Sequence, residues 1–540
     1  WTKCWVTSPS YRDWIVMVTA RRTSLHASAS KAGRRATGLP STLLLASLAL
    51  AALPAQGQGL RYAEDQAPGI VNPVFTTTMP EARLNELIFE GLYTDNQNLA
   101  SVPCLAESSE LSADRTELTV TLRRDVTWHD GTPFTAADVV FTIDAMKNKG
   151  TLSTEKGRVS WIQKAEVIDD NTVLLRFERP EARPEDKLLF KVLPAHGFTS
   201  QTIKRTDAFR NEPVGTGPYR FARYNDDNSI SLESHANHRD AVSIHEIVMR
   251  EVSDKNYQAK LLLYESLEAL VRVLPRDLAV LQNNRKVELY PYQTNSWWYL
   301  GFNLDRDPWK EPAVRQAVAH LVDVEALLAP IGTGDTLTGP YVKSSPYYNH
   351  DVPAWNYSSS QAATLLESAG YAQEGGQWMR DGQPLTLNIT AHQTLESSQE
   401  VVINLQSQLQ SAGMDVQVEF LDEAAWKARI WRERDYDLVL SQWTFDRNED
   451  IRDQFHSEGA RNFTGYQNDT VDGLLDKSRD TTDPHEKKAA LRDVHRLVHD
   501  DTPMVFLWTL DSYAALSTRV SSVVIHPFYF FTFVHDWRME

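Results

Sequence analysis

LTVTLRRDVTWHDGTPFTAADVVF, residues 118–141, places a strand, a tight turn and a helix start in immediate succession. Apolar and polar residues alternate at its beginning, which predicts a half-buried strand over Leu118–Arg123. Asp130-Gly131 is a turn signal. Thr135 stands three residues before Asp138 at the start of the apolar-periodic stretch Val139–Met146, which is the pattern of a capped helix N-terminus. We therefore expect a strand–turn–helix unit here.

Comparable patterns flank this unit on both sides. Before it, Leu60–Ala63 reads as a strand, and Leu84, Leu87 and Ile88 have the spacing of a buried helix face. After it, short alternating runs predict further strands at Glu166–Asp169, Val173–Phe177, Tyr219–Tyr224 and Ile230–Glu233.

From about residue 297, strands and helices alternate along the chain. The expected strands are Trp297–Asn303, Leu385–Thr390, Asp415–Phe420 and Asp437–Gln442, and the expected helices are Ala313–Leu328, Ser358–Ala369, Ser397–Ala412 and Glu423–Trp431. This alternation predicts an α/β unit with a largely parallel sheet. Ligands bind beyond the carboxyl ends of such strands, which makes Ser441–Asp446 a candidate ligand segment.

The first part of the chain has the features of a secretory leader. An apolar run, Leu43–Leu53, follows three basic residues and is followed by the small residues of Pro54–Gly57. This pattern predicts a signal peptide cleaved between Ala55 and Gly59, rather than a buried helix of the fold. We assign residues 1–57 to an upstream segment and signal peptide, with Met17 as a sensible start, and expect a periplasmic protein.

The net charge and the cysteine content restrict which partners and covalent links the protein can have. The whole chain has a formal net charge of −17, and residues 1–57 hold seven basic residues and one acid, so the remainder carries −23. Such a surface repels nucleic acid and anionic lipid. Cys104 is the only cysteine after the leader, so no internal disulfide can form, and no cysteine stands just after the apolar run, where a lipid is usually attached.

Residues 118–141 closely resemble the signature of family 5 extracellular solute-binding proteins, the dipeptide, oligopeptide and nickel receptors of ABC transporters. Three later segments resemble that family in the right order. They are PVGTGPY at 213–219 before a hairpin, PAVRQAV at 312–318 and YQNDTVDGL at 466–474. The resemblance runs from about Leu60 to the end of the chain.

The resemblance implies an α/β, two-lobed periplasmic-binding-protein fold, type II and cluster C-like. It implies a larger lobe of residues 58–296, with an extra subdomain at about 100–205, and a smaller lobe of residues 297–507. Residues 508–540 would return to the larger lobe. The chain departs from the family at Glu265–Glu268, where a "GEVD"-like turn is usual.

The resemblance also implies a ligand contact. Dipeptide receptors use a Trp-Thr-Gly-Asp segment to place an aspartate against the ligand's α-amino group, and Trp443-Thr-Phe-Asp446 matches it here. Asp446 would then form a charge-assisted hydrogen bond, flanked by Thr444. The alternative is a solvated loop acid paired with Arg447. Phe445 replaces the family glycine and adds bulk beside the amine position, which puts a standard dipeptide in doubt.

Other candidate contacts are weaker. Trp297 and Trp298 are adjacent strand residues, so only one can easily face a ligand while the other belongs to the core, and which one is open. Asn72, Phe75 and Asn462 are candidates by family position.

The spacing of the histidines and the absence of known enzyme motifs argue against a catalytic role. His495 and His499 have the i, i+4 spacing of a metal pair, but no third ligand is evident, so an exposed helix face is the better interpretation. His129 is expected to be structural. The chain has no Walker loop, HExxH or Gly-x-Ser-x-Gly motif, so we expect no enzyme, no metal and no cofactor.

These observations predict a monomeric periplasmic receptor of an ABC importer. It would bind a short peptide or peptide-like amine in the cleft between its lobes and deliver it to the permease subunits. A receptor for a sugar or nickel chelate on the same fold remains an alternative, and an exported peptide hydrolase is an alternative of another class.

Overall fold

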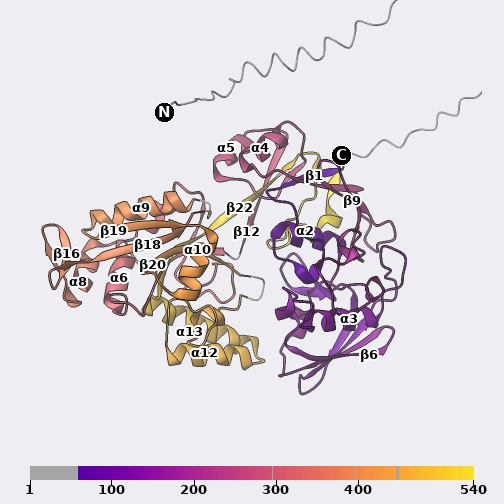
Figure 1. Cartoon of the computed structure of the whole chain (residues 1–540), viewed down its shortest axis with the longest axis horizontal. Helices are drawn as coiled ribbons and strands as arrows, with labels where there is room; N and C mark the ends of the chain where they lie inside the picture. Colours follow the sequence, from indigo (N-terminus) through magenta and orange to yellow (C-terminus); the bar gives the residue numbers. More distant parts are fainter. Residues whose placement is uncertain (1–58, 295, 394, 396, 446–448) are drawn as a thin grey trace, which may run out of the picture. The chain divides into compact units, whose positions relative to one another are not determined.

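A computed structural model describes residues 59–540 except 295, 394, 396 and 446–448 (Figure 1). The predicted signal peptide lies outside these residues. Within the described part, no helix is both long enough and apolar enough to cross a membrane.

The first sheet has the strand order β12-β22-β11-β1-β10-β9-β8, with β14 attached to β22. β1 is parallel to β10 and β11, and the other pairings are antiparallel. Its strands are β1 (Leu60–Glu64), β8 (Tyr219–Tyr224), β9 (Ile230–Ser234), β10 (Glu246–Glu251), β11 (Ala269–Leu270), β12 (Val287–Gln293), β14 (Gly334–Thr336) and β22 (Trp508–Ser517). The accompanying helices are α2 (Met79–Ile88), α4 (Lys255–Leu263) and α5 (Pro275–Gln282).

The strand–turn–helix unit predicted at residues 118–141 is confirmed. It contributes β5 (Glu117–Leu122) and α3 (Ala136–Lys147), and the Asp138 carboxylate accepts from the Thr135 backbone N–H at 2.8 Å. β5 belongs to an antiparallel sheet of order β4-β5-β7-β6. Its other strands are β4 (Ala106–Leu111), β6 (Ile162–Asp169) and β7 (Thr172–Phe177).

The turn at residues 213–219 requires its glycines. A Cβ on Gly215 would lie 1.8 Å from the Ile88 carbonyl oxygen, so no other residue fits without moving the backbone of α2. The His129 ring is 3.0 Å from the Gly217 carbonyl oxygen and accepts from the Gly215 N–H at 3.1 Å. His129 is therefore structural, as the sequence predicts.

The second sheet has the order β19-β18-β20-β13-β21. Its strands are β13 (Ser296–Phe302), β18 (Thr386–His392), β19 (Asp415–Leu421), β20 (Leu438–Thr444) and β21 (Met504–Phe506). β18 is parallel to β19 and β20, but β13 is antiparallel to both β20 and β21. The prediction of a largely parallel sheet is therefore corrected to a mixed one. β13 enters this sheet from β12 of the first sheet, so its direction is not set by a helical crossover between two strands of the second sheet, which is the connection that parallel strands need.

Helices lie on both sides of the second sheet, with α9 and the pair α12 and α13 flanking it in Figure 1. They are α6 (Pro312–Leu321), α7 (Val324–Leu328), α8 (Ser359–Ser368), α9 (Ser398–Ser411), α10 (Glu423–Lys427), α11 (Arg452–Phe455), α12 (Asp469–Asp480) and α13 (Pro484–Asp501). A π-helical turn, η6 (Ala428–Glu433), extends α10.

The single helix predicted over Ala313–Leu328 is wrong, because the chain forms α6 and α7 with a break between them. The Asp323 carboxylate accepts from the Ala326 N–H at 3.0 Å and so caps a new helix.

Shorter elements complete the described chain. They are β2 (Tyr93–Asp95), β3 (Ser101–Pro103), β15 (Ala372–Glu374), β16 (Gln377–Arg380), β17 (Gln383–Pro384), β23 (Val520–Ser521), β24 (Arg538–Met539), and the 3-10 turns η1 (Pro73–Phe75), η2 (Lys156–Arg158), η3 (Pro184–Lys187), η4 (Ala195–Gly197), η5 (Ala208–Arg210) and η7 (Val534–Asp536).

The expectation that His495 and His499 lie on an exposed helix face is also wrong. Both are buried on α13, because the loop around Thr338 packs over them. His495 Nε2 is 2.9 Å from Thr338 Oγ1, and His499 Nδ1 is 2.9 Å from the Thr338 carbonyl oxygen. Sequence spacing cannot show that a distant loop will cover a helix face. No group of side chains suited to hold a metal ion occurs among the described residues.

Candidate functional site

The parallel strands of the second sheet end along one edge. β18, β19 and β20 finish at His392, Leu421 and Thr444, and antiparallel β13 begins at the same edge. Ser296 Oγ and Thr444 Oγ1 are 3.0 Å apart across β13 and β20. The segment after Thr444 therefore leaves the sheet where α/β folds bind ligands.

Trp297 and Trp298 lie on opposite faces of β13, as predicted. The Trp297 ring centroid is 6.0 Å from that of Phe445 and 5.2 Å from that of Phe506. The Trp298 ring stacks on Trp508 at 5.9 Å, on the other side of the sheet. Only Trp297 thus shares a cluster with the predicted ligand segment, and its contact with a ligand stays a prediction.

The predicted ligand segment begins with a buried aromatic pair. Trp443 and Phe445 are each 8% exposed, and their ring centroids are 6.1 Å apart. The Arg461 guanidinium lies 5.6 Å from the Trp443 ring centroid, and Thr444 is exposed. Asp446 and Arg447 lie outside the described residues. The Phe445 ring packs into the cluster, so much of the bulk that replaces the family glycine is taken up by the protein itself.

The weaker candidates have internal partners. The Asn72 side chain accepts from the Val74 N–H at 3.1 Å and caps η1, and Phe75 is buried beneath the Arg205 guanidinium at 5.0 Å. The Asn462 amide donates to the Tyr466 carbonyl at 2.7 Å and accepts from the Tyr466 N–H at 3.0 Å. These polar groups shape turns of the chain, and their contact with a ligand stays a prediction.

The loop between β14 and α8 adds residues that the sequence did not single out. Tyr341 is buried and belongs to the same hydrophobic cluster as Trp297, Trp443 and Phe445. Ser345 Oγ donates to the Glu449 carboxylate at 2.5 Å, which ties the loop to the chain just beyond the predicted ligand segment. The abundance of proline and tyrosine in this loop marks it as irregular but gives no sign of where it packs.

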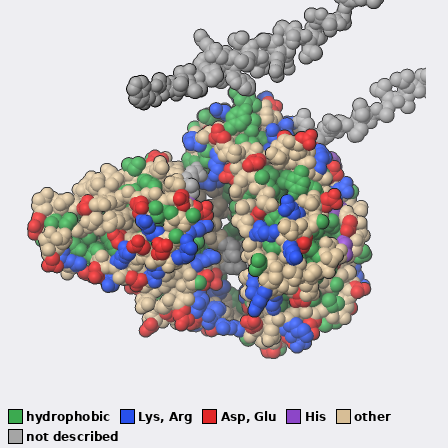
Figure 2. Space-filling view, in the orientation of Figure 1, with side chains coloured by type: hydrophobic (Ala, Val, Ile, Leu, Met, Phe, Trp, Pro, Cys, Tyr) green, Lys and Arg blue, Asp and Glu red, His purple; other side chains and the backbone are tan. Residues whose placement is uncertain are grey.

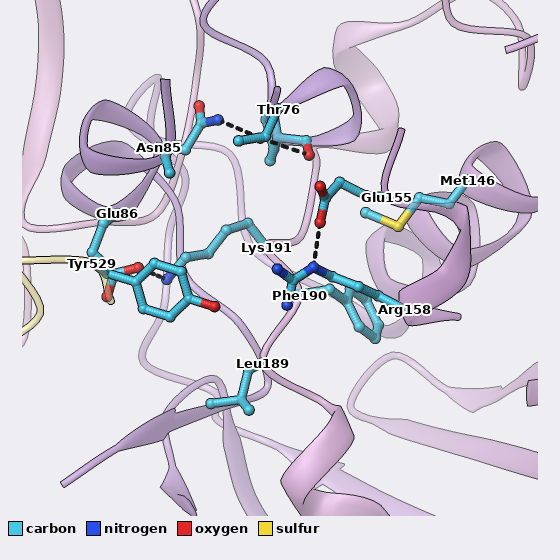
Figure 3. Close-up of a pocket in the computed structure, with 12 residues that line it drawn as sticks. Thr76, Asn85, Glu86, Met146, Glu155, Arg158, Leu189, Phe190, Lys191 and Tyr529 are labelled. Atoms are coloured by element: carbon cyan, nitrogen blue, oxygen red, sulfur yellow. Dashed lines mark hydrogen bonds and ion pairs between the residues drawn. The ribbon is translucent and has the colours of Figure 1, made fainter. Parts of the chain in front are cut away.

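A small cavity of about 60 Å³ lies beside the loop that follows β1 (Figure 3). It is lined by Pro73, Thr76, Ala82, Asn85, Glu86, Met146, Glu155, Arg158, Leu189, Phe190, Lys191 and Tyr529. A water occupies roughly 30 Å³ of liquid volume, so the cavity could hold about two waters but not a peptide.

The cations of this cavity are paired within it. Lys191 Nζ is 2.5 Å from the Glu86 carboxylate, and Arg158 pairs with Glu155. Burial disfavours the charged lysine, but the charge and hydrogen bond of Glu86, with the smaller effects of Cys104 and Tyr529, together outweigh it and raise the pKa of Lys191. The charged groups that line the cavity thus neutralise one another, and the cavity lies next to the predicted candidates Asn72 and Phe75.

Surface charge shows no single-sign field on the face drawn in Figure 2, where acidic and basic side chains are interspersed. With a net charge of −17 for the whole chain, this surface offers no basic stripe for a phosphate backbone on that face.

A family model described as bacterial extracellular solute-binding proteins, family 5 Middle, matches residues 100–459. The chain belongs to this family. A glutathione-binding protein, GsiB of Pectobacterium atrosepticum, is 26% identical over 82% of this chain and 87% of its own length.

Solved structures share the fold. The oligopeptide-binding protein AppA of Bacillus subtilis, in complex with a nonapeptide, has a TM-score of 0.74 at 21% identity, over 90% of this chain and 100% of that chain. NikA of Brucella suis, in complex with Fe(III)-EDTA, has a TM-score of 0.81 at 21% identity, over 89% and 99%. The two-lobed α/β fold expected from the sequence is thereby confirmed, while the predicted lobe limits stay predictions.

Proposed function

We propose that this family 5 protein is the periplasmic receptor of an ABC importer for a short peptide or peptide-like amine. The observation that carries the proposal is the position of Trp443, Thr444 and Phe445. They lead from the carboxyl end of β20 directly into Asp446, at the edge of the sheet where a ligand is expected.

Asp446 supplies the chemistry of recognition. A carboxylate enclosed with a ligand ammonium forms a hydrogen bond roughly twice as strong as a neutral one. A ligand without the amine leaves that carboxylate buried and unpaired, which is strongly unfavourable. The aromatic surroundings of Trp297 and Trp443 lower the local dielectric and strengthen this selection.

Binding is coupled to closure of the lobes. The first and second sheets are joined where β12 passes into β13, and β22 pairs with both β14 and β12. These strands serve as the hinge, and a ligand that contacts both lobes shifts the population toward the closed form. The closed monomer then docks on the permease subunits and releases its ligand unchanged, without cofactor or turnover.

Thermal-shift measurements on the mature protein test the proposal. The probes are alanyl peptides of two to five residues, glutathione, maltose and a nickel–histidine chelate. We expect stabilisation by a peptide or by glutathione, followed by recovery of the intact probe. Stabilisation by the sugar or chelate alone would assign the site to those ligands, cleaved peptide would indicate a hydrolase, and no shift with any probe would contradict a receptor.

Asp446→Asn separates amine recognition from general binding. Removing one partner of an enclosed charge pair costs about 3 kcal/mol, or roughly 100-fold in affinity. Asp453→Asn is the control, because Asp453 is an exposed acid on α11, after the predicted ligand segment. Equal affinity of Asp446→Asn and the wild type would contradict the role of Asp446 but leave the fold assignment intact.

A further inference from the structure

Two arginines of the β4-β5-β7-β6 sheet reach the turn between α12 and α13. Arg115 Nη1 donates to the Thr482 carbonyl oxygen at 3.2 Å, and Arg179 Nη1 is 3.2 Å from the Asp480 carboxylate. Arg115 lies in the turn between β4 and β5, and Arg179 follows β7. The helices α12 and α13 pack on the second sheet. These two contacts therefore join parts of the chain that belong to different sheets.

The contacts form away from the strands that connect the first and second sheets. Figure 1 shows β12 and β22 running between the two sheets, while the α12–α13 pair lies apart from both strands and reaches toward the sheet that holds β6. Rotation about a hinge displaces a point in proportion to its distance from the hinge. A contact placed so far from β12 and β22 is therefore broken early when the lobes rotate apart.

The turn between β4 and β5 holds Arg115 in place. Its φ of 59° lies in the left-handed region, which residues other than glycine rarely adopt. The Arg115 N–H donates to the Ser112 carbonyl oxygen, and the Arg115 carbonyl oxygen accepts from the Glu181 N–H, both at 2.9 Å. A side chain that starts from a fixed backbone loses less conformational freedom when it binds.

The α12–α13 turn supplies the matching acceptors. α12 ends at Asp480, and the carbonyl groups at a helix C-terminus carry partial negative charge that favours a nearby cation. Asp480 is also 2.9 Å from Arg479 of its own helix, which positions its carboxylate. A hydrogen bond from a charged group is stronger than an exposed ion pair. We therefore expect Arg115 to contribute more than Arg179.

A neighbouring turn lies near the same helices. Burial raises the pKa of Tyr347, the charges of Glu449 and Asp186 add to the rise, and Arg183 opposes it. Arg183 and Asp186 belong to η3 and its cap, beyond β7, whereas Tyr347 lies in the loop between β14 and α8. Lys487 of α13 lies 5.7 Å from the centroid of the Tyr347 ring. The segment after β7 thus approaches the second sheet's helices at more than one point.

We propose that Arg115 and Arg179 clasp the α12–α13 turn and hold the two lobes closed, so that they set ligand affinity without touching the ligand. They are positioning residues. A receptor's apparent affinity is reduced by the fraction of molecules outside the binding-competent form, and the clasp raises the closed fraction before a ligand arrives. The effect on affinity rests on the proposed function, whereas the effect on closure does not.

Small-angle X-ray scattering of the ligand-free mature protein tests closure. The double variant Arg115→Gln/Arg179→Gln should have a larger radius of gyration than the wild type. Its urea midpoint should be unchanged, because neither sheet needs the clasp to fold. The matched control is Arg176→Gln, since Arg176 on β7 pairs with Glu117 and Glu166 of its own sheet, and it should scatter like the wild type. Identical scattering of the double variant and the wild type would overturn the clasp.

Charge reversal separates the clasp from a general loss of structure. Arg179→Glu faces Asp480 with a like charge and should increase the radius of gyration. Adding Asp480→Lys restores an attractive pair of opposite polarity and should return the radius to that of the wild type. A double reversal that stays as extended as Arg179→Glu would contradict the contact between Arg179 and Asp480.

Calorimetric titration with an alanyl peptide of two to five residues tests the effect on affinity. The double variant Arg115→Gln/Arg179→Gln should bind about tenfold more weakly than the wild type, because the closed fraction falls by that factor. A double variant that is more extended but binds equally well would overturn the link between the clasp and affinity. A wild type that binds no probe would overturn the proposed function, and the scattering comparison would still decide the clasp.

Discussion

The two faces of the second sheet share the same strands but are covered by different side chains. One face packs against α6, α8 and α9, and aromatic residues make up six of the 32 buried apolar residues described in its core. The other packs against α12, α13 and the loop around Tyr341, and twelve of its 22 are aromatic. We call these the aliphatic face and the aromatic face.

This difference separates stability from recognition. Aliphatic side chains contribute by burial and close packing alone, and they make up most of the aliphatic face. Tyrosine and tryptophan combine a large apolar surface with a polar group that needs a partner. Among the described residues, the Trp297 indole N–H and the Tyr341 hydroxyl find none on the aromatic face, and the indole N–H groups of Trp298 and Trp508 find none on the aliphatic face. Because the aromatic face includes Trp443 and Phe445 of the predicted ligand segment, we expect the aliphatic face to govern folding and the aromatic face to govern ligand binding.

Leu405→Ala tests the aliphatic face and should have the largest effect. Leu405 is fully buried on α9, so its truncation leaves a cavity and should lower the free energy of unfolding by about 3 kcal/mol. Urea unfolding gives this change. Peptide affinity of the folded fraction should stay within twofold of the wild type, and a larger loss would mean that the two faces are not separate.

Acidification should weaken the aromatic face. Burial, with His499, His350 and Arg492 nearby, lowers the pKa of His495 to about 3, so the folded protein keeps it neutral. The unfolded chain takes up this proton below its ordinary pKa of about 6.5, so the stabilisation is present above that pH and is lost as pH falls toward 3. Between pH 7 and pH 5 this one histidine should cost about 2 kcal/mol.

Urea unfolding of His495→Gln at pH 7.5, 6 and 5 checks the assignment. The variant should be less stable at pH 7.5, because the hydrogen bonds of His495 to Thr338 and Asn349 are altered. It should nevertheless lose about 2 kcal/mol less than the wild type on acidification. An identical pH dependence in the two proteins would show that other groups control acid stability.

Trp297→Phe and Trp298→Phe give the smallest and most direct comparison, since adjacent residues lie on opposite faces. Trp298→Phe should cost about 1 kcal/mol of stability, through its stacking with Trp508, and leave peptide affinity unchanged. Trp297→Phe should weaken peptide binding about fivefold. Calorimetric titration with the peptide and urea unfolding of both variants measure these two effects. Weaker peptide binding in Trp298→Phe, with unchanged binding in Trp297→Phe, would assign the ligand to the aliphatic face.

Much of the fold follows from local pattern. The capped start of α3 depends only on Thr135 and Asp138, and the alternation of β5 only on its own residues, so both are readable from residues 118–141. The break between α6 and α7 was missed because the apolar period continues across it, while the cap formed by Asp323 interrupts the helix.

The candidate site was predictable in part. Trp443, Thr444 and Phe445 follow a strand that the sequence marks, and their place at its carboxyl end follows from topology. Tyr341 was not predictable, because it lies 102 residues before Trp443 in a loop whose apolar residues have no regular spacing. Contacts across such separations are set by how helices and loops pack, which no local pattern records.

The sequence by itself determined the family, the strand–turn–helix unit of residues 118–141, and the opposite orientations of Trp297 and Trp298, because each depends on local sequence or on the two-residue alternation of a strand. Only the tertiary structure decided that β13 runs against its neighbours, that α13 buries His495 and His499, and that the Tyr341 hydroxyl is left without a partner. The physical reason is that burial and hydrogen-bond satisfaction belong to the space between elements, and that space is defined only after they pack.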